Sequence, residues 1–297
     1  MTNHLLDCLV VGGGPGGLTA AVYLARFKRS CLVVDADDSR LKRIAKTRNV
    51  LGFPDGIAGS ELLQRVREHA ARYQVPVESG CVGTLAPLAG GGFEARDGER
   101  SWRARTVVLA TGALDVEPEV EDLEQGLQHA LVRYCPVCDG FETQGRRVAV
   151  LGKAGHGQRE AAFVAGFGNE VTWLSMQTQH TVGEQEVERL RRRMRIADQA
   201  PRRIRCAPGD GVHVELADGQ TLRFDLLYSA LGLRHASELA TSLGAGVLDD
   251  GQLAVDGHMQ TTVPGLYAVG DVAGGLNQIN VAAGHAAIAA TAIHNSL

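Results

Sequence analysis

Two cysteines separated by two residues and followed directly by an aspartate are the residues of this chain best suited to redox chemistry. They are Cys135, Cys138 and Asp139, in the stretch RYCPVCDGFE at residues 133–142. Two intervening residues allow the thiols to close a small disulfide ring, and a helix start after the first cysteine can stabilise a thiolate. Pro136 suits a first helical turn, because its missing N–H would have no partner there. The spacing alone leaves open a metal site, a structural disulfide or a redox pair.

The other cysteines and the expected compartment narrow this choice. Four further cysteines are isolated, and Cys8 and Cys31 lie in apolar runs that predict buried side chains. A structural zinc site normally needs a second cysteine pair or two histidines at ligand spacing. Neither accompanies this pair, so we expect no metal. No signal peptide is recognisable, and in the cytoplasm, where we expect this protein, stable disulfides are rare. A redox pair is the favoured interpretation.

The bulk composition argues against two classes of partner. The chain has 297 residues, 44% of them hydrophobic, and a net charge of −4 at pH 7. This length suits about two domains. The negative charge argues against nucleic acid, because no global basic field exists to collect phosphates. The longest apolar stretch, residues 279–293, is short and interrupted by His285, so it predicts a packed helix rather than a membrane span.

A glycine-rich segment near the start has the full context of a dinucleotide fingerprint. Residues 8–36 predict a strand, a turn with Gly12, Gly14 and Gly17, an alanine-rich helix, and a second strand ending at Asp35. The first glycine permits a tight turn, the second lets the backbone approach a pyrophosphate, and the third lets helix and strand pack closely. The helix start offers amides to phosphate, and the acid can accept from a ribose hydroxyl. We therefore expect a dinucleotide here.

A second strand–turn–helix–strand pattern, at residues 146–175, carries a degraded fingerprint. Its positions are Gly152, Ala154 and Gly157. A Cβ at the middle position obstructs close approach of a pyrophosphate. The second strand ends near Ser175 without an acid for a ribose diol or an arginine for a 2′-phosphate. The sequence therefore predicts that the Rossmann-like fold is retained and that NADPH is a poor reductant.

Four shorter patterns complete the chain. Residues 106–113 predict a strand ending in a small-residue turn, and residues 265–295 a strand, a Gly-Asp turn and a long helix. We expect a hairpin at 88–102. Residues 185–195 place apolar side chains at helical spacing, with arginines on the remaining faces. That pattern is typical of a solvated helix, and a docking patch for an acidic partner is the alternative.

Taken in order, these motifs resemble the low-molecular-weight, bacterial-type thioredoxin reductase family of FAD-dependent disulfide oxidoreductases. The resemblance covers nearly the whole chain. Besides the N-terminal glycines it rests on RNVLGFPDGIAG (48–59), ATGA (110–113), CxxCD (135–139), YAVGD (267–271) and NQ…AAG (277–284). The combination of these motifs in this order identifies the family more specifically than any single motif.

The resemblance implies an α/β fold of two Rossmann-like, three-layer ββα domains, the second inserted into the first. Residues 1–114 and 240–297 would form the FAD-binding domain. Residues 115–239 would form the inserted NAD(P)-type domain that carries the two cysteines. The family stretch Gly-Gly-Gln, which approaches the flavin, is replaced here by DDSRLKRIAKTRN (37–49), so contacts on that side differ. The family also implies a homodimer.

Roles for single residues follow from the same resemblance. Cys138 would face the flavin, Cys135 would exchange with the substrate disulfide, and Asp139 would donate or accept the proton of the leaving thiol. The residues implied to bind FAD are Gly12, Gly14, Pro15, Gly17, Asp35, Asn49, Ala110, Thr111, Gly112, Gly270, Asp271 and Gln278.

The expected function is thiol–disulfide exchange coupled to FAD, with a thioredoxin-like protein or a small disulfide as the partner. The direction of electron flow stays open. As an oxidase of small dithiols, the chain would pass electrons to O2 and need no nicotinamide site. As a ferredoxin-dependent reductase, it could use the arginine-rich residues 185–195 to bind an acidic donor. A non-enzymatic, flavin-bound redox sensor is the remaining alternative. Neither a membrane nor nucleic acid is expected as a partner.

Overall fold

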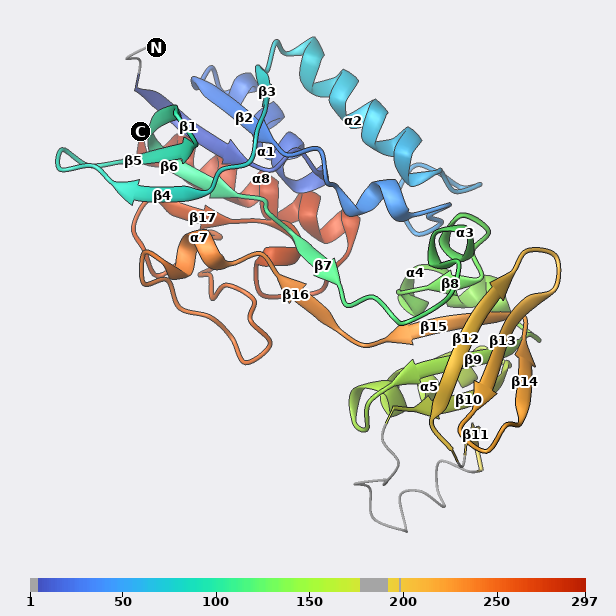
Figure 1. Cartoon of the computed structure of the whole chain (residues 1–297). Helices are drawn as coiled ribbons and strands as arrows, with labels where there is room; N and C mark the ends of the chain where they lie inside the picture. Colours follow the sequence, from blue (N-terminus) through green and yellow to red (C-terminus); the bar gives the residue numbers. More distant parts are fainter. Residues whose placement is uncertain (1–4, 177–191, 198) are drawn as a thin grey trace. The chain divides into compact units, whose positions relative to one another are not determined.

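The computed structural model describes residues 5–176, 192–197 and 199–297, which group into two compact units (Figure 1). The first unit comprises Met1–Lys42, Gly59–Leu114 and Arg234–Leu297. The second comprises Arg43–Ala58 and Asp115–Leu233. Segment Arg43–Ala58, which the sequence analysis leaves in the first domain, thus groups with the second unit.

The first unit is built on a largely parallel sheet. Its elements are β1 (Leu6–Val11), α1 (Pro15–Arg26), β2 (Cys31–Asp35), α2 (Gly59–Arg72), β3 (Val77–Ser79), β4 (Thr84–Pro87), β5 (Phe93–Asp97), β6 (Arg100–Leu109), α7 (Glu238–Thr241), β17 (Leu266–Ala268) and α8 (Ile279–Ser296). The strand order is β3-β2-β1-β6-β5-β4, and β17 also pairs with β6. Strands β4 and β5 are antiparallel, and β5 and β6 form the hairpin expected at 88–102.

Packing in this unit follows from its apolar strands and small-residue helices. The strands β1 and β2 are almost entirely buried, as expected for parallel strands covered on both faces. Helices α1 and α8 pack directly against each other (Figure 1). Gly16 of α1 lies beside Ala282 of α8, since a Cβ placed on this glycine would be 3.7 Å from Ala282. The alanine-rich stretch 279–293 is therefore a packed helix, as the sequence predicts.

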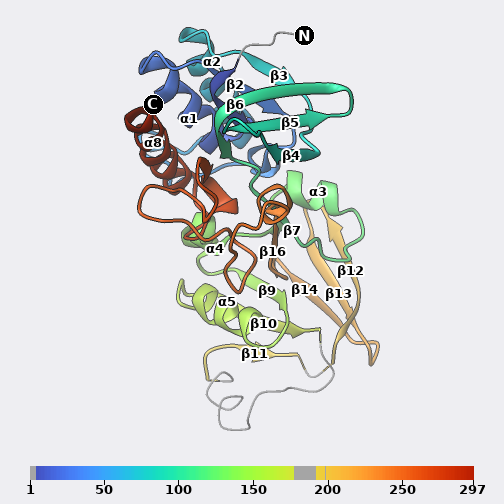
Figure 2. The same ribbon diagram turned by 90° about the vertical axis from the view of Figure 1, so that its left-hand side faces the viewer.

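The second unit has three layers. Its elements are α3 (Leu123–Gln128), β8 (Val132–Arg133), α4 (Pro136–Asp139), β9 (Arg147–Gly152), α5 (His156–Ala165), β10 (Glu170–Ser175), β11 (Arg195–Ile196), β12 (Pro201–Ala207), β13 (Gly211–Leu216), β14 (Thr221–Phe224) and β15 (Leu226–Ala230). A parallel sheet, ordered β11-β10-β9-β15-β8, has α5 on one face and the antiparallel sheet β12-β13-β14 on the other (Figure 2).

Alternation along the strands explains these layers. On β9, Val148 and Val150 pack toward α5, whereas Ala149 and Leu151 pack toward β12–β14. Successive side chains of a strand point to opposite faces, so one apolar run supplies both cores. The second Rossmann-like unit is thus retained, and the expected α/β fold is confirmed.

The remaining strands, β7 (Ala113–Asp115) and β16 (Leu233–His235), lie where the chain passes between units, and they pair with each other. Within the described ranges, no helix combines the length and the apolar character needed to cross a membrane. Most of the helix expected at 185–195 lies outside the described residues.

Candidate functional site

The two cysteines of the CxxC motif form a disulfide at the start of α4. The S–S distance is 2.04 Å, and the Cys138 N–H donates to the Cys135 carbonyl at 3.0 Å. Strand β8 ends at Arg133, so the motif directly follows the carboxyl end of an edge strand. Pro136 occupies the first helical position, as its fixed φ favours. The chain therefore presents the pair at the end of a parallel sheet, where Rossmann-like folds place their reactive groups.

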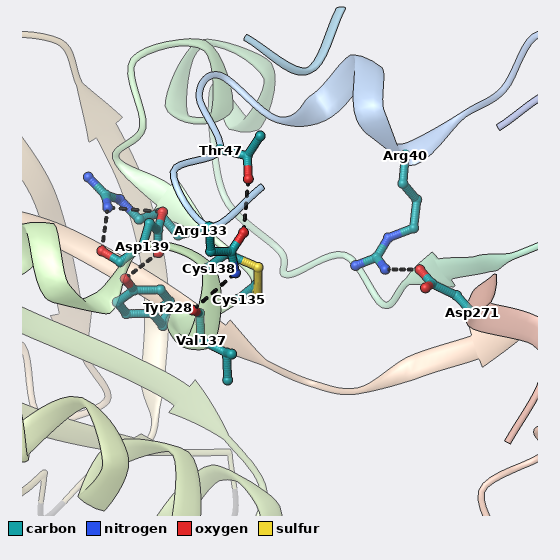
Figure 3. Close-up of a disulfide and its surroundings, with 10 residues drawn as sticks. Arg40, Thr47, Arg133, Cys135, Val137, Cys138, Asp139, Tyr228 and Asp271 are labelled. Atoms are coloured by element: carbon teal, nitrogen blue, oxygen red, sulfur yellow. Dashed lines mark hydrogen bonds and ion pairs between the residues drawn. A yellow bond between two sulfur atoms is a disulfide. The ribbon is translucent and has the colours of Figure 1, made fainter. Parts of the chain in front are cut away.

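Both oxygens of the Asp139 carboxylate are held by side chains from the sheet. The Tyr228 hydroxyl donates to Oδ1 at 2.6 Å, and Nη1 of Arg133 lies 3.0 Å from Oδ2 (Figure 3). Strands β8 and β15 run parallel with Arg133 opposite Tyr228, so both side chains reach the same carboxylate. Arg133 is itself fixed, since its Nε donates to the Ala130 carbonyl at 3.0 Å.

Burial dominates the electrostatics of this carboxylate. Desolvation raises the pKa of Asp139, and it outweighs the opposing effects of the Arg133 charge and the Tyr228 hydrogen bond; the nearby Glu142 charge adds to the rise. Burial, together with the adjacent Asp139 charge, also raises the pKa of Tyr228, which therefore stays protonated and acts as a donor. A carboxyl with a raised pKa beside a disulfide is suited to exchange protons with thiols.

A pocket of about 260 Å³ opens beside the disulfide within the second unit. The residues that line it are Arg48, Asn49, Val137, Cys138, Asp139, Phe141, Glu142 and Phe167. Two apolar side chains beside the motif are exposed, Phe141 at 70% and Val137 at 49%. At the rim, Nε of Arg48 lies 3.8 Å from Glu142 Oε1. The pocket therefore combines exposed apolar side chains with one sulfur of the disulfide and a carboxylate.

Asn49 reaches this pocket from segment Arg43–Ala58. Its Nδ2 lies 3.5 Å from the Val137 carbonyl, and the Thr47 hydroxyl donates to its Oδ1 at 3.1 Å. The structure thus places Asn49 beside α4 in the second unit. The flavin contact expected for Asn49 stays a prediction.

The dinucleotide fingerprint lies where three parallel strands of the first unit end. Val11 of β1 pairs with Leu109 of β6, which pairs with Ala268 of β17. The turns after these strands carry the expected FAD-binding residues at the same sheet edge: Gly12 and Gly14 after β1, Ala110–Gly112 after β6, and Gly270–Asp271 after β17. Ligands of open α/β sheets bind at this edge.

Glycine is required in the first of these turns for two different reasons. Gly12 has a φ of +108°, and a Cβ on it would lie 2.4 Å from the Ala110 oxygen. A Cβ on Gly17 would lie 1.9 Å from the Gly12 oxygen, which would separate α1 from β1. By contrast, a Cβ on Gly14 would meet only the Ser39 hydroxyl, at 3.5 Å, and one on Gly112 would meet nothing within 4 Å. Backbone open in this way fits a closely approaching dinucleotide, as expected for Gly14.

Asp35 is placed at the end of β2 and is buried at 8% exposure. Its Oδ1 accepts from the Gly13 N–H at 3.0 Å, and its Oδ2 lies 3.1 Å from Nη2 of Arg67. A Cβ on Gly13 would lie 2.3 Å from the carboxylate, so this position also requires glycine. The sequence analysis missed Gly13 because the fingerprint leaves that position unspecified.

Asp271, expected to bind FAD, pairs with Arg40 at 2.6 Å (Figure 3). Its backbone carbonyl lies 2.7 Å from Nδ1 of His235. Arg40 belongs to the stretch that replaces the family's Gly-Gly-Gln segment, so this departure supplies a cation to the turn after β17. Gln278 begins α8 as its N-cap, and Thr111 is fixed by a 2.6 Å hydrogen bond to the Ala236 carbonyl.

The second glycine turn retains its packing role. A Cβ on Gly157 would lie 2.8 Å from backbone atoms of Gly152, so α5 and β9 pack closely through these two glycines. Ala154 is partly buried against the α5-facing core, and Gly155 carries the positive φ of the turn, +82°. The side chain at the middle fingerprint position therefore packs against the core of the unit.

Tyr228 and Arg133 are the site residues that motif reading missed. Arg133 precedes the cysteines, but nothing in its spacing marks it as a partner of Asp139. Tyr228 is 89 residues from Asp139 in the chain. Only the pairing of β8 with β15, which brings the two strands into register, could have revealed it.

Comparisons with known proteins agree with this geometry. The model of the pyridine nucleotide-disulphide oxidoreductase family matches residues 6–286. The thioredoxin reductase of Mycolicibacterium smegmatis is 30% identical over 277 residues, covering 90% of this chain and 88% of that protein. The thioredoxin reductase of Bacillus subtilis is 26% identical over 311 residues, covering 99% and 95%.

Solved structures show the same fold over almost the whole chain. The thioredoxin reductase of Streptococcus pyogenes superposes with a TM-score of 0.90 at 26% identity, covering 99% of this chain and 98% of that one. A protein named HlmI gives a TM-score of 0.91 at 26% identity, covering 99% and 93%. An oxidoreductase from Agrobacterium tumefaciens gives 0.86 at 28% identity, covering 99% and 98%.

Proposed function

This chain belongs to the pyridine nucleotide-disulphide oxidoreductase family, as a thioredoxin reductase-like FAD enzyme, and we propose that it passes electrons between FAD and the Cys135–Cys138 pair. In the reductase direction, the pair then reduces a thioredoxin-like protein or a small disulfide. The observation that carries the proposal is the pocket of the second unit, which combines Cys138 of the disulfide with the partly buried Asp139 carboxylate.

The exchange step uses only groups of the second unit and the substrate. With the pair reduced, the Cys135 thiolate attacks one sulfur of a substrate disulfide RSSR′. A Cys135–SR bond forms, and R′S⁻ leaves with the electron pair of the broken bond and takes a proton from Asp139. The Asp139 carboxylate then takes the proton of the Cys138 thiol. The resulting Cys138 thiolate attacks Cys135 Sγ, re-forms the enzyme disulfide and releases RS⁻, which takes that proton from Asp139. Two electrons pass from the enzyme dithiol to the substrate.

The first unit contributes the cofactor site. The turns after β1, β6 and β17 offer open backbone at Gly14 and Gly112, an acid at Asp35 and a charged pair at Arg40 and Asp271. In this proposal the residues that would hold FAD in the first unit are Gly12, Gly14, Pro15, Gly17, Asp35, Ala110, Thr111, Gly112, Gly270, Asp271 and Gln278. Bound FAD supplies two-electron exchange with the cysteine pair.

We also propose that NADPH is a weak electron donor to this enzyme. The Ala154 Cβ occupies the position where the fingerprint needs open backbone, and the partly buried side chain packs against the core of the unit. Strand β10 ends at the buried Ser175, which is neither an acid for a ribose nor a cation for a 2′-phosphate. Lys153 and His156 flank the turn and could meet an anion, but they lack the planar fork with which arginine binds phosphate.

The degraded turn favours a second candidate function, oxidation of small dithiols. In that direction, a substrate dithiol reduces the Cys135–Cys138 disulfide and becomes a disulfide itself. Asp139 accepts a proton from the attacking thiol, and O2 is the final acceptor of the two electrons. This candidate needs no nicotinamide. A ferredoxin-dependent reductase would rest on residues 185–195, most of which lie outside the described residues.

A turnover panel tests the proposal and its direction. The purified, FAD-loaded chain is assayed with thioredoxin or a small aromatic disulfide plus a reductant, and separately with dithiols plus O2. We expect turnover in one of the two directions, and loss of at least about a hundredfold in Cys138→Ser, because exchange then stops at the mixed disulfide. Undiminished turnover in Cys138→Ser, or no turnover with any dithiol or disulfide, would remove the cysteine pair from the function.

A further inference from the structure

Resting on the function proposed above, we infer that Arg133 and Tyr228 are positioning residues that hold both oxygens of Asp139 and so orient this carboxylate for proton transfer at the Cys135–Cys138 pair. Neither residue belongs to a motif in the sequence. The geometry assigns them the role: one donor on Oδ1 at 2.6 Å, one cation on Oδ2 at 3.0 Å.

The place of Tyr228 in the fold gives its hydroxyl a specific purpose. The residue is fully buried, on the face of β15 that packs against α5, among Val148, Val150 and Trp173. A phenylalanine would satisfy that apolar environment equally well. A buried tyrosine hydroxyl must find a partner, since an unpaired polar group in a core costs about 1–3 kcal/mol. Here the partner is the Asp139 carboxylate, so a residue of the core fixes the position of the acid beside the disulfide.

Arg133 contributes charge and rigidity from the opposite strand. Its side chain is 19% exposed, and that of Asp139 is 20% exposed, so the pair is shielded from bulk water on most sides. The guanidinium donates to the Ala130 carbonyl through Nε and faces Asp139 through Nη1, so it cannot swing away without losing two contacts. A lysine could keep the charge but not this geometry.

Two opposing effects on the pKa of Asp139 determine how this pKa should change in the variants. Desolvation by burial favours the neutral acid, whereas the Arg133 charge and the Tyr228 hydrogen bond favour the carboxylate. A further charge that acts on Asp139 is that of Glu142, which favours the neutral acid and itself lies 3.8 Å from Arg48. Removing Arg133 or Tyr228 leaves burial less opposed, so either change raises the pKa of Asp139 further.

The pH dependence of exchange tests this role in either direction of electron flow. The rate of exchange plotted against pH has one limb that is set by the ionisation of Asp139. In one direction of electron flow this limb requires the protonated acid, and in the other it requires the carboxylate. In both cases the limb shifts with the pKa of Asp139. In Tyr228→Phe and in Arg133→Met we expect that limb to move to higher pH by about one unit. Arg133→Lys should restore most of the wild-type position, and in Asp139→Asn the limb should be absent.

A second readout avoids turnover. The rate at which iodoacetamide alkylates the reduced chain is measured against pH, because a thiol whose proton is shared with Asp139 titrates together with it. We expect the same upward displacement in Tyr228→Phe. Arg147→Met and Tyr73→Phe are matched controls, since they remove an arginine paired with Asp225 at 3.2 Å and a tyrosine hydroxyl bound by Arg26, both away from the site. Both should reproduce the wild-type profile.

The outcomes separate this inference from the proposed function. Profiles of Tyr228→Phe and Arg133→Met that superimpose on the wild type, or that fall equally at every pH, would overturn the inference alone, because the two residues would then serve only the fold. Should Arg133→Met fail to fold, Tyr228→Phe, which removes a single oxygen atom, decides by itself. Full turnover in Cys138→Ser would instead overturn the proposed function.

Discussion

The surroundings of the two cysteines differ, although they form one disulfide. Cys138 lines the pocket together with Asp139, while the buried Pro136 follows Cys135 and fixes the start of α4. The family resemblance implies that Cys135 attacks the substrate and Cys138 resolves the mixed disulfide. This division of roles stays a prediction.

Trapping the mixed disulfide distinguishes the two roles. In Cys138→Ser the resolving thiol is missing, so Cys135 should hold an adduct that persists after treatment with 5,5′-dithiobis(2-nitrobenzoate). Intact mass spectrometry detects one added thionitrobenzoate. All variants carry Cys81→Ser, because Cys81 is an exposed cysteine that would react as background. A stable adduct in Cys135→Ser and none in Cys138→Ser would reverse the assignment.

The chemical roles of individual residues could be predicted from the sequence only where those residues belong to a local motif. The CxxCD stretch and the spaced glycines each lie within a few residues, so their types and spacing carry the chemistry. The partners of Asp139 and Asp35 could not be read this way. Tyr228 and Arg67 come from distant segments, and their contacts depend on strand register and helix packing that no local pattern records.

Among the elements, the turn between β1 and α1 separates glycines needed for folding from glycines needed for binding. Gly14→Ala brings its Cβ only into ordinary contact with the Ser39 hydroxyl, at 3.5 Å, so the chain should fold with an unchanged melting temperature when free of FAD. Overpacking against a bound pyrophosphate costs about 1–3 kcal/mol, which predicts roughly 10- to 100-fold weaker FAD binding. Fluorescence titration of the apoprotein with FAD measures this change.

Gly17→Ala is the contrasting variant in the same turn. Its Cβ would lie 1.9 Å from the Gly12 oxygen, so the chain itself should be destabilised, by at least about 1–3 kcal/mol. Gly83→Ala, where a Cβ meets nothing within 4 Å, is the control and should leave stability and FAD binding unchanged. If Gly14→Ala bound FAD as tightly as the wild type, the fingerprint would not be the pyrophosphate site.

Helix α5 carries a buried acid that should make folding stability depend on pH. Burial raises the pKa of Glu160 to about 7, and no partner for its Oε1 is found among the described residues. Between pH 4.5 and about 7 the folded chain binds a proton here that the unfolded chain does not. Stability should therefore fall as pH rises through this window, by at most about 3 kcal/mol.

Glu160→Gln should remove this part of the pH dependence. Urea unfolding at pH 5 and pH 8 gives the free energy of unfolding for both chains. His156, whose Nε2 lies 3.4 Å from the acid, is present in both, so its own titration largely cancels in the comparison. Glu61→Gln, on the exposed face of α2, is the control and should retain the wild-type difference. Equal pH dependence in Glu160→Gln and the wild type would show that this carboxyl ionises normally in the folded state.

Most elements followed from the sequence, because their signals are local. Strands β1 and β9, helices α1 and α5 and the β5–β6 hairpin lie where the apolar runs and glycine turns predict them. The three-stranded sheet β12–β14 was not predicted, although Pro208–Gly209 and Asp218–Gly219 are turn signals between its short strands. The grouping of Arg43–Ala58 with the second unit could not be predicted either, because contacts across the chain decide it.

At the scale of the whole molecule, the main question is which electron donor reduces the bound flavin. Loss of a bidentate arginine–phosphate contact costs about 1.5–3 kcal/mol, or roughly one to two powers of ten in affinity. The Ala154 Cβ adds a steric obstacle. We therefore expect slow, incomplete reduction of the bound flavin when the chain is mixed with millimolar NADPH in an anaerobic stopped-flow instrument.

A matched variant sharpens the NADPH test. Ala154→Gly removes the Cβ but supplies no arginine, so it should improve the apparent NADPH affinity by less than about tenfold. The wild-type flavin could instead bleach fast and completely, with a rate that saturates at micromolar NADPH. That result would show that the enzyme binds the nucleotide through other residues. The argument from Ala154 and the strand end at Ser175 would then be wrong.

The most direct test of the account is anaerobic reduction of the FAD-loaded chain by a dithiol. Absorbance near 450 nm follows the flavin while dithiothreitol is added to the wild type and to the two single-cysteine variants. If electrons pass through the Cys135–Cys138 disulfide, the wild-type flavin should bleach with two electrons per dithiol, and Cys135→Ser and Cys138→Ser should stay oxidised over the same time. Bleaching of either variant at the wild-type rate would contradict the central claim that the cysteine pair connects the flavin to thiol substrates.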